Sequence, residues 1–181
     1  MARVIVVGSI NQDVTVTVDR FPTPGETLSG SSLTYGLGGK GANQAAAAAR
    51  SGIPTLFVGA VGTDLAGHSL RTHLAAHGVD VSHLREVDSP SGTALITVAA
   101  SGENTIILDA GANRASSIAL AKASLSPDIV VLQAEIPPAA NAAAIEWAHS
   151  FGARILLNLA PARATDPATL SRVDILVVNE T

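Results

Sequence analysis

The sequence lacks cysteine entirely, which excludes a disulfide framework and any zinc or iron–sulfur centre ligated by cysteine. Aromatic residues fill only 3% of its 181 positions, too few for a surface that stacks the bases of single-stranded nucleic acid. The formal charge of −4 argues against nucleic-acid binding through a broad basic face. Only 14% of residues are charged while 47% are hydrophobic, and this balance excludes a disordered chain.

Long apolar runs are absent as well. No stretch approaches the roughly 18 apolar residues that a membrane helix needs. The first apolar run, residues 4–7, ends at Gly8 and is too short for a signal peptide. We therefore expect a protein of the reducing cytoplasm.

The apolar residues that are present form short runs rich in valine and isoleucine, and helical segments lie between several of them. Such runs are typical of strands buried on both faces of a parallel sheet. The alternation predicts a doubly wound α/β fold. The predicted strands are residues 3–8, 55–61, 129–132, 155–157 and 175–178, and the predicted helices are residues 42–50, 65–77 and 138–151.

Two stretches follow a different pattern. Residues 13–19 alternate strictly between polar and apolar, and residues 93–109 read as a hairpin around Ser101-Gly102-Glu103-Asn104. Residues 26–35 are predicted to be extended too. One-sided strands of this kind form antiparallel sheets with one free face. We expect a small antiparallel sheet, made by segments of approximately 13–35 and 93–109, that serves as a lid or a subunit contact; surface hairpins without a function are the alternative.

A glycine-rich segment, Gly-Leu-Gly-Gly-Lys-Gly-Ala-Asn-Gln over residues 36–44, precedes the first predicted helix. Glycine permits positive φ and close approach of a ligand, and the first amides of a helix point out of its end. A Walker P-loop is excluded because Gly41 follows Lys40 where serine or threonine is needed. A dinucleotide fingerprint fits the spacing but should follow the first buried strand. A cradle for a neutral polyol or small anion fits best, and a tight turn feeding a close-packed helix is the structural alternative.

Polar side chains follow several predicted strands, at the edge where the carboxyl ends of parallel strands gather. Asn11 and Asp13 follow the first strand, Glu135 the third, and Asn179 the fifth. Carboxylates and amides are strong partners for sugar hydroxyls, although asparagine or aspartate after a strand often only caps a turn. His73 and His77 have a zinc-like spacing, but Leu74 replaces the glutamate of the zinc motif, which favours a solvated helix face.

Several of these segments together resemble the ribokinase group of the PfkB-type carbohydrate kinases. The resemblance covers the whole chain. The segments that carry it are residues 8–13 (Gly-Ser-Ile-Asn-Gln-Asp), 21–27 (Phe-Pro-Thr-Pro-Gly-Glu-Thr), 38–45 (Gly-Gly-Lys-Gly-Ala-Asn-Gln-Ala), 109–113, 132–135, 158–163 and 178–181.

The resemblance implies one incomplete ribokinase-like α/β domain over residues 1–181: a three-layer body with a mostly parallel sheet and a small antiparallel β lid. It also implies ATP-dependent phosphoryl transfer to the 5-hydroxyl of D-ribose, with Mg²⁺ and K⁺ as activators and a homodimer formed through the lid. It assigns Asn179 to the nucleotide phosphates. The residues that it assigns to the sugar are Asn11, Gln12, Asp13, Gly39, Lys40, Gly41, Ala42, Asn43 and Glu135.

One family signature has no counterpart in this sequence. The Asp-x-x-Gly-Ala-Gly-Asp type of segment, which supplies an anion hole and the catalytic base, is absent. Phosphoryl transfer needs such a base near the acceptor. We therefore expect that the C-terminal half is missing, that no residue of this chain is the catalytic base, and that the chain alone is inactive. A kinase for another sugar or a nucleoside, a non-catalytic sugar-binding or dimerising module and, more distantly, a nicotinamide-dependent oxidoreductase are the alternatives.

Overall fold

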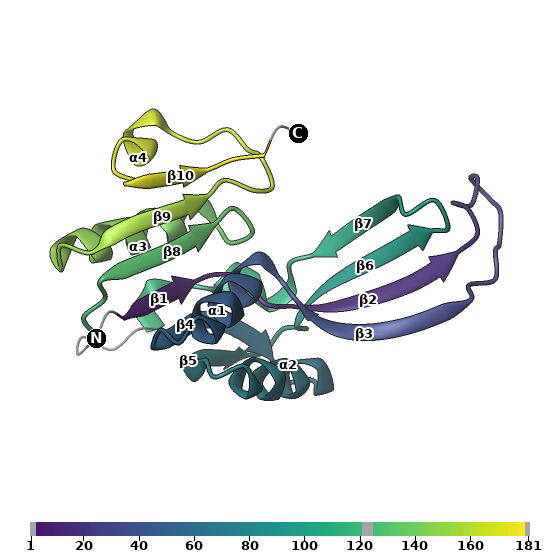
Figure 1. Cartoon of the computed structure of the whole chain (residues 1–181), viewed down its shortest axis with the longest axis horizontal. Helices are drawn as coiled ribbons and strands as arrows, with labels where there is room; N and C mark the ends of the chain where they lie inside the picture. The colour runs from purple at the N-terminus through teal and green to yellow at the C-terminus, as the bar shows by residue number, and fades with distance from the viewer. Residues whose placement is uncertain (1–2, 121–124, 180–181) are drawn as a thin grey trace.

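A computed structural model describes residues 3–120 and 125–179, which form two β-sheets (Figure 1). The larger sheet has six parallel strands in the order β10-β9-β8-β1-β4-β5. We call this sheet and its helices the body. The strands are β1 (Val4–Val7), β4 (Thr55–Gly62), β5 (Asp80–Val87), β8 (Ile129–Gln133), β9 (Arg154–Asn158) and β10 (Ile175–Val177).

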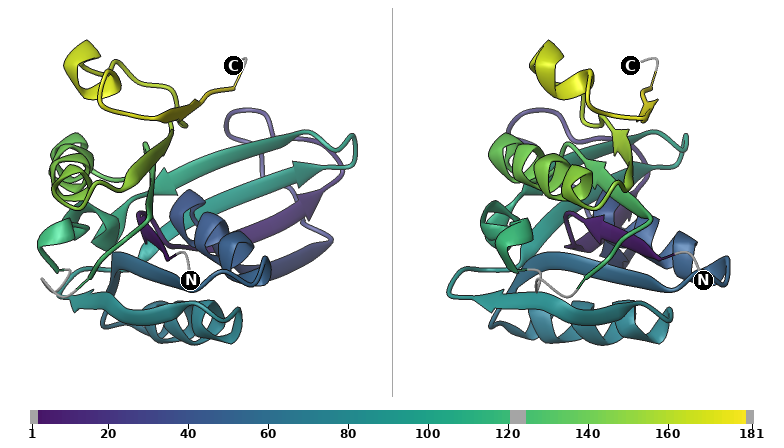
Figure 2. Two further views of the ribbon diagram at one scale, coloured as in Figure 1. Left: turned by 60° about the vertical axis from the view of Figure 1, so that its left-hand side comes forward. Right: turned by 90° about the vertical axis from the view of Figure 1, so that its left-hand side faces the viewer.

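Helices cover both faces of the body sheet, as Figure 2 shows. Alternate residues of β1 point to opposite sides, so Val4 and Val6 join one core cluster while Ile5 and Val7 join the other. The first cluster packs against α1 (Lys40–Arg50) and α2 (Leu65–Ala76), and the second against α3 (Pro138–Ser150). The short elements are η1 (Gly111–Ala115), η2 (Ile118–Leu120) and α4 (Pro167–Leu170). The predicted three-layer α/β body is confirmed.

Strand β5 is the strand of the body that the apolar runs did not predict. It lies at the edge of the sheet and pairs only with β4 among the described residues. An edge strand has one open side, so its sequence, Asp-Val-Ser-His-Leu-Arg-Glu-Val, carries many polar residues and only Leu84 is buried. A search for apolar runs does not find such a strand.

The second sheet, which we call the arm, projects from the body (Figure 1). Its four strands lie in the order β3-β2-β6-β7. They are β2 (Asn11–Val18), β3 (Ser32–Gly38), β6 (Gly92–Ala99) and β7 (Asn104–Asp109). The predicted hairpin of β6 and β7 is confirmed.

The prediction of a purely antiparallel arm is wrong, because the central strands β2 and β6 pair in parallel. Both strands leave the body at the same place and run outward, so they point the same way. The sheet is therefore mixed, with antiparallel pairs only at its two sides.

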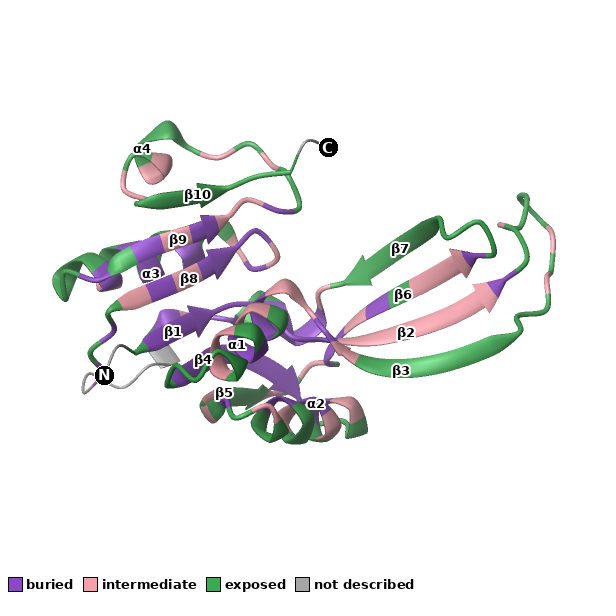
Figure 3. Ribbon diagram, viewed as in Figure 1, coloured by how far each residue is buried: buried purple, intermediate pink, exposed green. Residues whose placement is uncertain are grey.

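The two sheets differ in how far they are buried (Figure 3). β1 and β4 are buried along their whole length, whereas β7 is exposed at every position. The arm is therefore held by its strand pairing and by its junction with the body, not by a core of its own. None of the helices formed by residues 3–120 and 125–179 is long and apolar enough to span a bilayer.

Candidate functional site

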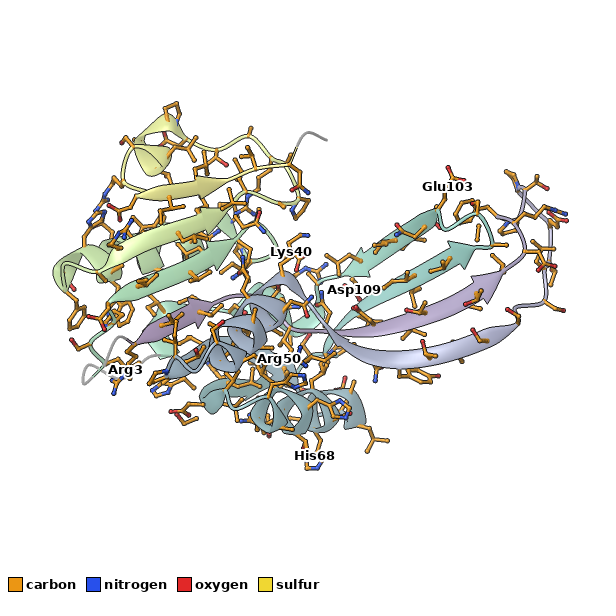
Figure 4. All side chains as sticks on the ribbon, in the orientation of Figure 1. Arg3, Lys40, Arg50, His68, Glu103 and Asp109 are labelled. Atoms are coloured by element: carbon orange, nitrogen blue, oxygen red, sulfur yellow. The ribbon has the colours of Figure 1, made fainter. Side chains whose placement is uncertain are left out.

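The predicted sugar-binding residues lie mainly where the chain passes between body and arm. It makes this passage four times, at residues 8–10, 39, 88–91 and 110, and we call these segments the neck. Figure 4 shows Lys40 and Asp109 at this junction. Loops at the carboxyl ends of parallel strands are the usual place for ligands in an α/β sheet, and the neck includes such loops after β1 and β5.

Ser9 connects the loops of the neck through its hydroxyl group. Ser9 Oγ donates a hydrogen bond to Glu135 Oε2 (2.6 Å) and accepts one from the amide of Gly41 (3.2 Å). The same Glu135 oxygen accepts from the amide of Lys40 (2.9 Å), and the Ser9 carbonyl accepts from the amide of Ala42 (2.9 Å). The first three amides of α1 are thus bonded to protein groups, whereas the glycine-rich motif predicted that they point at a ligand.

This close contact between α1 and the loop after β1 requires two of the glycines. Gly39 has a φ of 88°, and a Cβ there would press on the backbone of Ile10 at 2.8 Å. A Cβ on Gly41 would come within 2.7 Å of the Ser9 backbone. The segment is less of a turn than predicted, because residues 36–38 finish strand β3 and only Gly39 separates it from α1.

Gln133 fixes the end of β1 beneath this loop. Its side chain is fully buried, donates from Nε2 to the Val7 carbonyl (3.0 Å), and accepts at Oε1 from the Ser9 amide (3.3 Å). A Cβ on Gly8 would collide with the Gln133 amide. Gln133 therefore has a structural role: at the carboxyl end of β8, two residues before Glu135, it stabilises the loop after β1.

Asp13 lies two residues into the arm, half-buried, with its carboxyl group over Gly38, where any side chain would collide with it. Burial raises the pKa of Asp13, and the nearby negative charge of Glu135 raises it further. Asp13 of the arm and Glu135 of the body thus present two carboxyl groups that lie close enough for their charges to interact.

A cavity of about 500 Å³ lies between the neck, the arm and the loops after β8 and β9. Lys40 and Glu135 line it on the side of the neck, and Ile106 and Leu108 of β7 line it from the arm. Asn179, which follows β10, lines it too. Glu180 and Thr181, the rest of that matched motif, lie outside the described residues.

Arg163 stabilises the loop that carries Glu135, a role that was not predicted from the sequence. Its guanidinium donates to the Ile136 carbonyl (3.0 Å), and the Ala134 amide donates to the Ala160 carbonyl (3.2 Å). Partial burial lowers the pKa of Arg163. Side-chain bonds to a backbone carbonyl have no local sequence signal, which is why inspection of the sequence could not find this contact.

The structure places the predicted residues in three environments. Lys40, Glu135 and Asn179 share the cavity, with Asp13 close enough to Glu135 for their charges to interact. Asn11 and Ala42 are buried at the neck, and Asn43 is exposed on the first turn of α1.

Gln12 is a predicted residue of the arm that lies on the face turned away from the cavity. Alternate residues of a strand face opposite sides, and Asp13 shares its face with Leu108 through the register of β2, β6 and β7. Gln12 is the neighbour of Asp13 in the strand and lies on the opposite face.

Among the described residues, no group of three or more histidine, aspartate or glutamate side chains could hold a metal ion. The pair His73 and His77 lies on the exposed last turn and cap of α2, where His77 Nδ1 lies 2.8 Å from the His73 carbonyl oxygen.

Comparison with known proteins gives consistent results. The profile of the pfkB family of carbohydrate kinases matches residues 1–181. The chain is 39% identical to the ribokinase of Haemophilus influenzae, over 97% of this chain and 59% of that protein. It is 41% identical to the ribokinase of Staphylococcus aureus, over 99% of this chain and 61% of that protein.

A solved structure of Arabidopsis thaliana ribokinase, complexed with ribose and ATP, superposes with a TM-score of 0.84 at 34% identity. The match covers 99% of this chain and 61% of that one. The chain thus spans about three fifths of the length of these relatives.

Proposed function

This chain belongs to the pfkB family of carbohydrate kinases, and from that premise we propose that it forms the sugar-binding part of a D-ribose kinase. The reaction transfers the terminal phosphoryl group of ATP to the 5-hydroxyl of the sugar. Its relatives at 39% and 41% identity are ribokinases, which supports ribose as the acceptor.

The observation that carries the proposal is that Lys40 and Glu135, from separate segments, line one cavity, and that Asp13 of the arm lies close enough to Glu135 for their charges to interact. The two carboxylates accept hydrogen bonds from adjacent sugar hydroxyls, for which charged acceptors are the stronger partners. The Lys40 ammonium supplies positive charge on the same side, where a transferred phosphoryl group would need it. Two carboxylate acceptors and one ammonium group suit a neutral polyol that gains negative charge when it is phosphorylated.

ATP is the proposed phosphoryl donor, and Asn179 is the residue that we assign to its phosphates. Asn179 lines the same cavity as Lys40, so the two ends of the reaction would meet there. Mg²⁺ is commonly held by one or two carboxylates together with the phosphates of its nucleotide, so we propose that it enters with ATP. K⁺ as an activator rests on the family resemblance alone.

We assign the arm two roles, one for each face. The inner face bears Asp13, Ile106 and Leu108 and lines the cavity, so it would act as the lid over bound ribose. The outer face bears Tyr35, Leu95 and Ile107, which are 65%, 52% and 71% exposed, and would form the contact of a homodimer.

Calorimetric titration of the chain with D-ribose, in the absence of ATP, tests the proposal. We expect saturable binding at one site, a loss of affinity of about tenfold or more in Asp13→Ala, and no loss in Glu103→Gln at the exposed tip of the arm. Fructose and nucleosides should bind more weakly. Equal binding of a nucleoside would assign a different acceptor, and no binding of any of them would contradict the sugar site.

A further inference from the structure

Asn113 is a buried side chain at the neck to which the proposed function gives no part. It belongs to η1, just after the arm returns to the body, and only 1% of its surface is exposed. A polar side chain so deeply buried is expected to have all its hydrogen-bonding groups paired.

The Asn113 amide makes three hydrogen bonds, all to the segment that leads into β2. Its Oδ1 accepts from the amide of Ile10 (2.9 Å). Its Nδ2 donates to the carbonyl of Ile10 (3.1 Å) and to Oδ1 of Asn11 (2.7 Å). One side chain therefore holds both the backbone and the first candidate sugar ligand of the loop.

These contacts fix the direction of both side-chain amides. The two ends of an asparagine amide have nearly the same shape, so their assignment depends on their partners. The backbone of Ile10 decides it, because an N–H group can only donate and a carbonyl can only accept. Asn113 must then face Asn11 with an N–H group, and Asn11 must answer with its oxygen.

Gly92 supports this reading from an independent direction. It pairs with Asn11 in the register of β2 and β6. A Cβ at this position would collide with both Nδ2 of Asn113 and Oδ1 of Asn11. The missing side chain leaves room for this hydrogen bond.

We infer that Asn113 is a positioning residue that turns Asn11 so that its Nδ2 group, a donor only, is the end available to the sugar. Asp13, two residues further along the same face of β2, offers an acceptor. A hydroxyl group, which both accepts and donates, matches this pair, whereas a deoxygenated carbon matches neither. The inference rests on the proposed sugar site and explains how that site obtains its polarity.

The substitution Asn113→Asp tests the inference because it keeps the shape and the acceptor for Ile10 but replaces the donor with an oxygen. Asn11 must then turn its own N–H groups toward the new carboxylate and present its oxygen to the sugar. The experiment measures affinities for ribose and for each monodeoxy ribose by calorimetry, in wild type, Asn11→Ala and Asn113→Asp. Ser116→Ala is the matched control, because Ser116 is a buried serine of the same segment and its hydroxyl has no hydrogen-bond partner within residues 3–120 and 125–179.

We expect Asn11→Ala to identify one hydroxyl, the one whose removal no longer weakens binding in that variant. Asn113→Asp should weaken ribose about tenfold and become indifferent to the same hydroxyl, while Ser116→Ala keeps the wild-type pattern. A loss in Asn113→Asp that is equal for ribose and all its deoxy analogues would indicate a merely structural part and overturn the inference. Unchanged binding would overturn it too.

A measurement on the wild-type chain covers the case in which Asn113→Asp does not fold. The side-chain ¹⁵N–¹H₂ signals of Asn11, assigned by their loss in Asn11→Asp, should shift when ribose is added, because these protons meet the sugar. If ribose binds and these signals stay in place, the inference is wrong while the proposed function stands. If the wild-type chain binds no sugar at all, the proposed function itself fails.

Discussion

The ionised form of Asp13 is the form that we expect to bind sugar, and it is also the form that destabilises the folded chain. Burial and the charge of Glu135 both disfavour its ionised form, so its pKa in the folded chain is raised above the ordinary value of 3.8. A group whose folded pKa is raised stabilises the fold below its unfolded pKa, and this contribution is lost as the pH rises through the folded pKa. At neutral pH the ionised carboxylate is therefore a cost to stability.

The first prediction is that Asp13→Asn makes the chain more resistant to urea at pH 7 and less able to bind ribose. The gain in the free energy of unfolding should shrink as the pH falls from 7 toward 4, because Asp13 of the folded wild type takes up its proton at a higher pH than Asp13 of the unfolded chain. Urea titrations at the two pH values measure it. A variant less stable than wild type at pH 7 would show that the carboxylate makes stabilising contacts.

At the scale of elements, the network around Asp64 ties the arm to the body. Asp64 caps α2 by accepting from the Gly67 amide (2.7 Å), and its other oxygen accepts from the amide of Ser91 (2.8 Å) just before β6. Ser91 Oγ donates to Asp64 (2.6 Å) and accepts from the amide of Gly62 (2.9 Å). The end of β4, the start of α2 and the entry to the arm are thus one connected unit.

We expect Asp64→Ala to lower the free energy of unfolding by about 1–2 kcal/mol, because it removes a helix cap and leaves the Ser91 amide without its acceptor. Hydrogen exchange of β6 should become faster, since its attachment is released. Asp166→Ala is the control: Asp166 caps the four-residue helix α4 (Ala168 amide to Asp166, 3.0 Å) and has no described bond to the arm. Equal exchange rates of β6 in both variants would contradict the role of Asp64 as a tie.

The elements found from the sequence are those whose signal is local. The α/β body could be predicted because its signals lie in residues that are neighbours in the sequence. These signals are the buried apolar runs of β1 and β4 and the glycines that follow α1 and α3. The direction in which β6 pairs with β2 depends on the path of the intervening residues 19–91, and no local alternation contains it. The edge strand β5 could not be predicted from apolar runs because most of its residues are polar.

The candidate site divides in the same way. Polar residues after strands, such as Asp13 and Glu135, can be read from the chain once parallel strands are assumed. The bonds of Ser9, Arg163 and Asn113 join loops 27 to 126 positions apart, and only the register of the fold brings these partners together. Likewise, only the pairing of the arm strands shows that Gln12 and Asp13 lie on opposite faces of the arm.

At the scale of the whole molecule, the outer face of the arm is an apolar surface with nothing from the described residues over it. The pairing aligns Tyr35, Val14, Leu95 and Ile107 in one row across all four strands. A sheet stabilises itself by burying at least one face, and a second copy of the same sheet packed face to face would bury this row in both chains.

The last prediction is that the chain is a homodimer joined through this outer face, and that Leu95→Glu converts it to a monomer. Glutamate in the middle of the row would place an unpaired charge in the buried contact, where its desolvation opposes association strongly. Sedimentation velocity over a range of concentrations measures the change in mass. The matched control is Leu65→Glu on α2, since Leu65 is 91% exposed and should leave the dimer intact. A wild-type chain that sediments as a monomer, or a Leu95→Glu variant that remains a dimer, would contradict this interface. Loss of the dimer should leave ribose bound with little change in affinity, because Leu95 faces away from the side of the arm that carries Asp13.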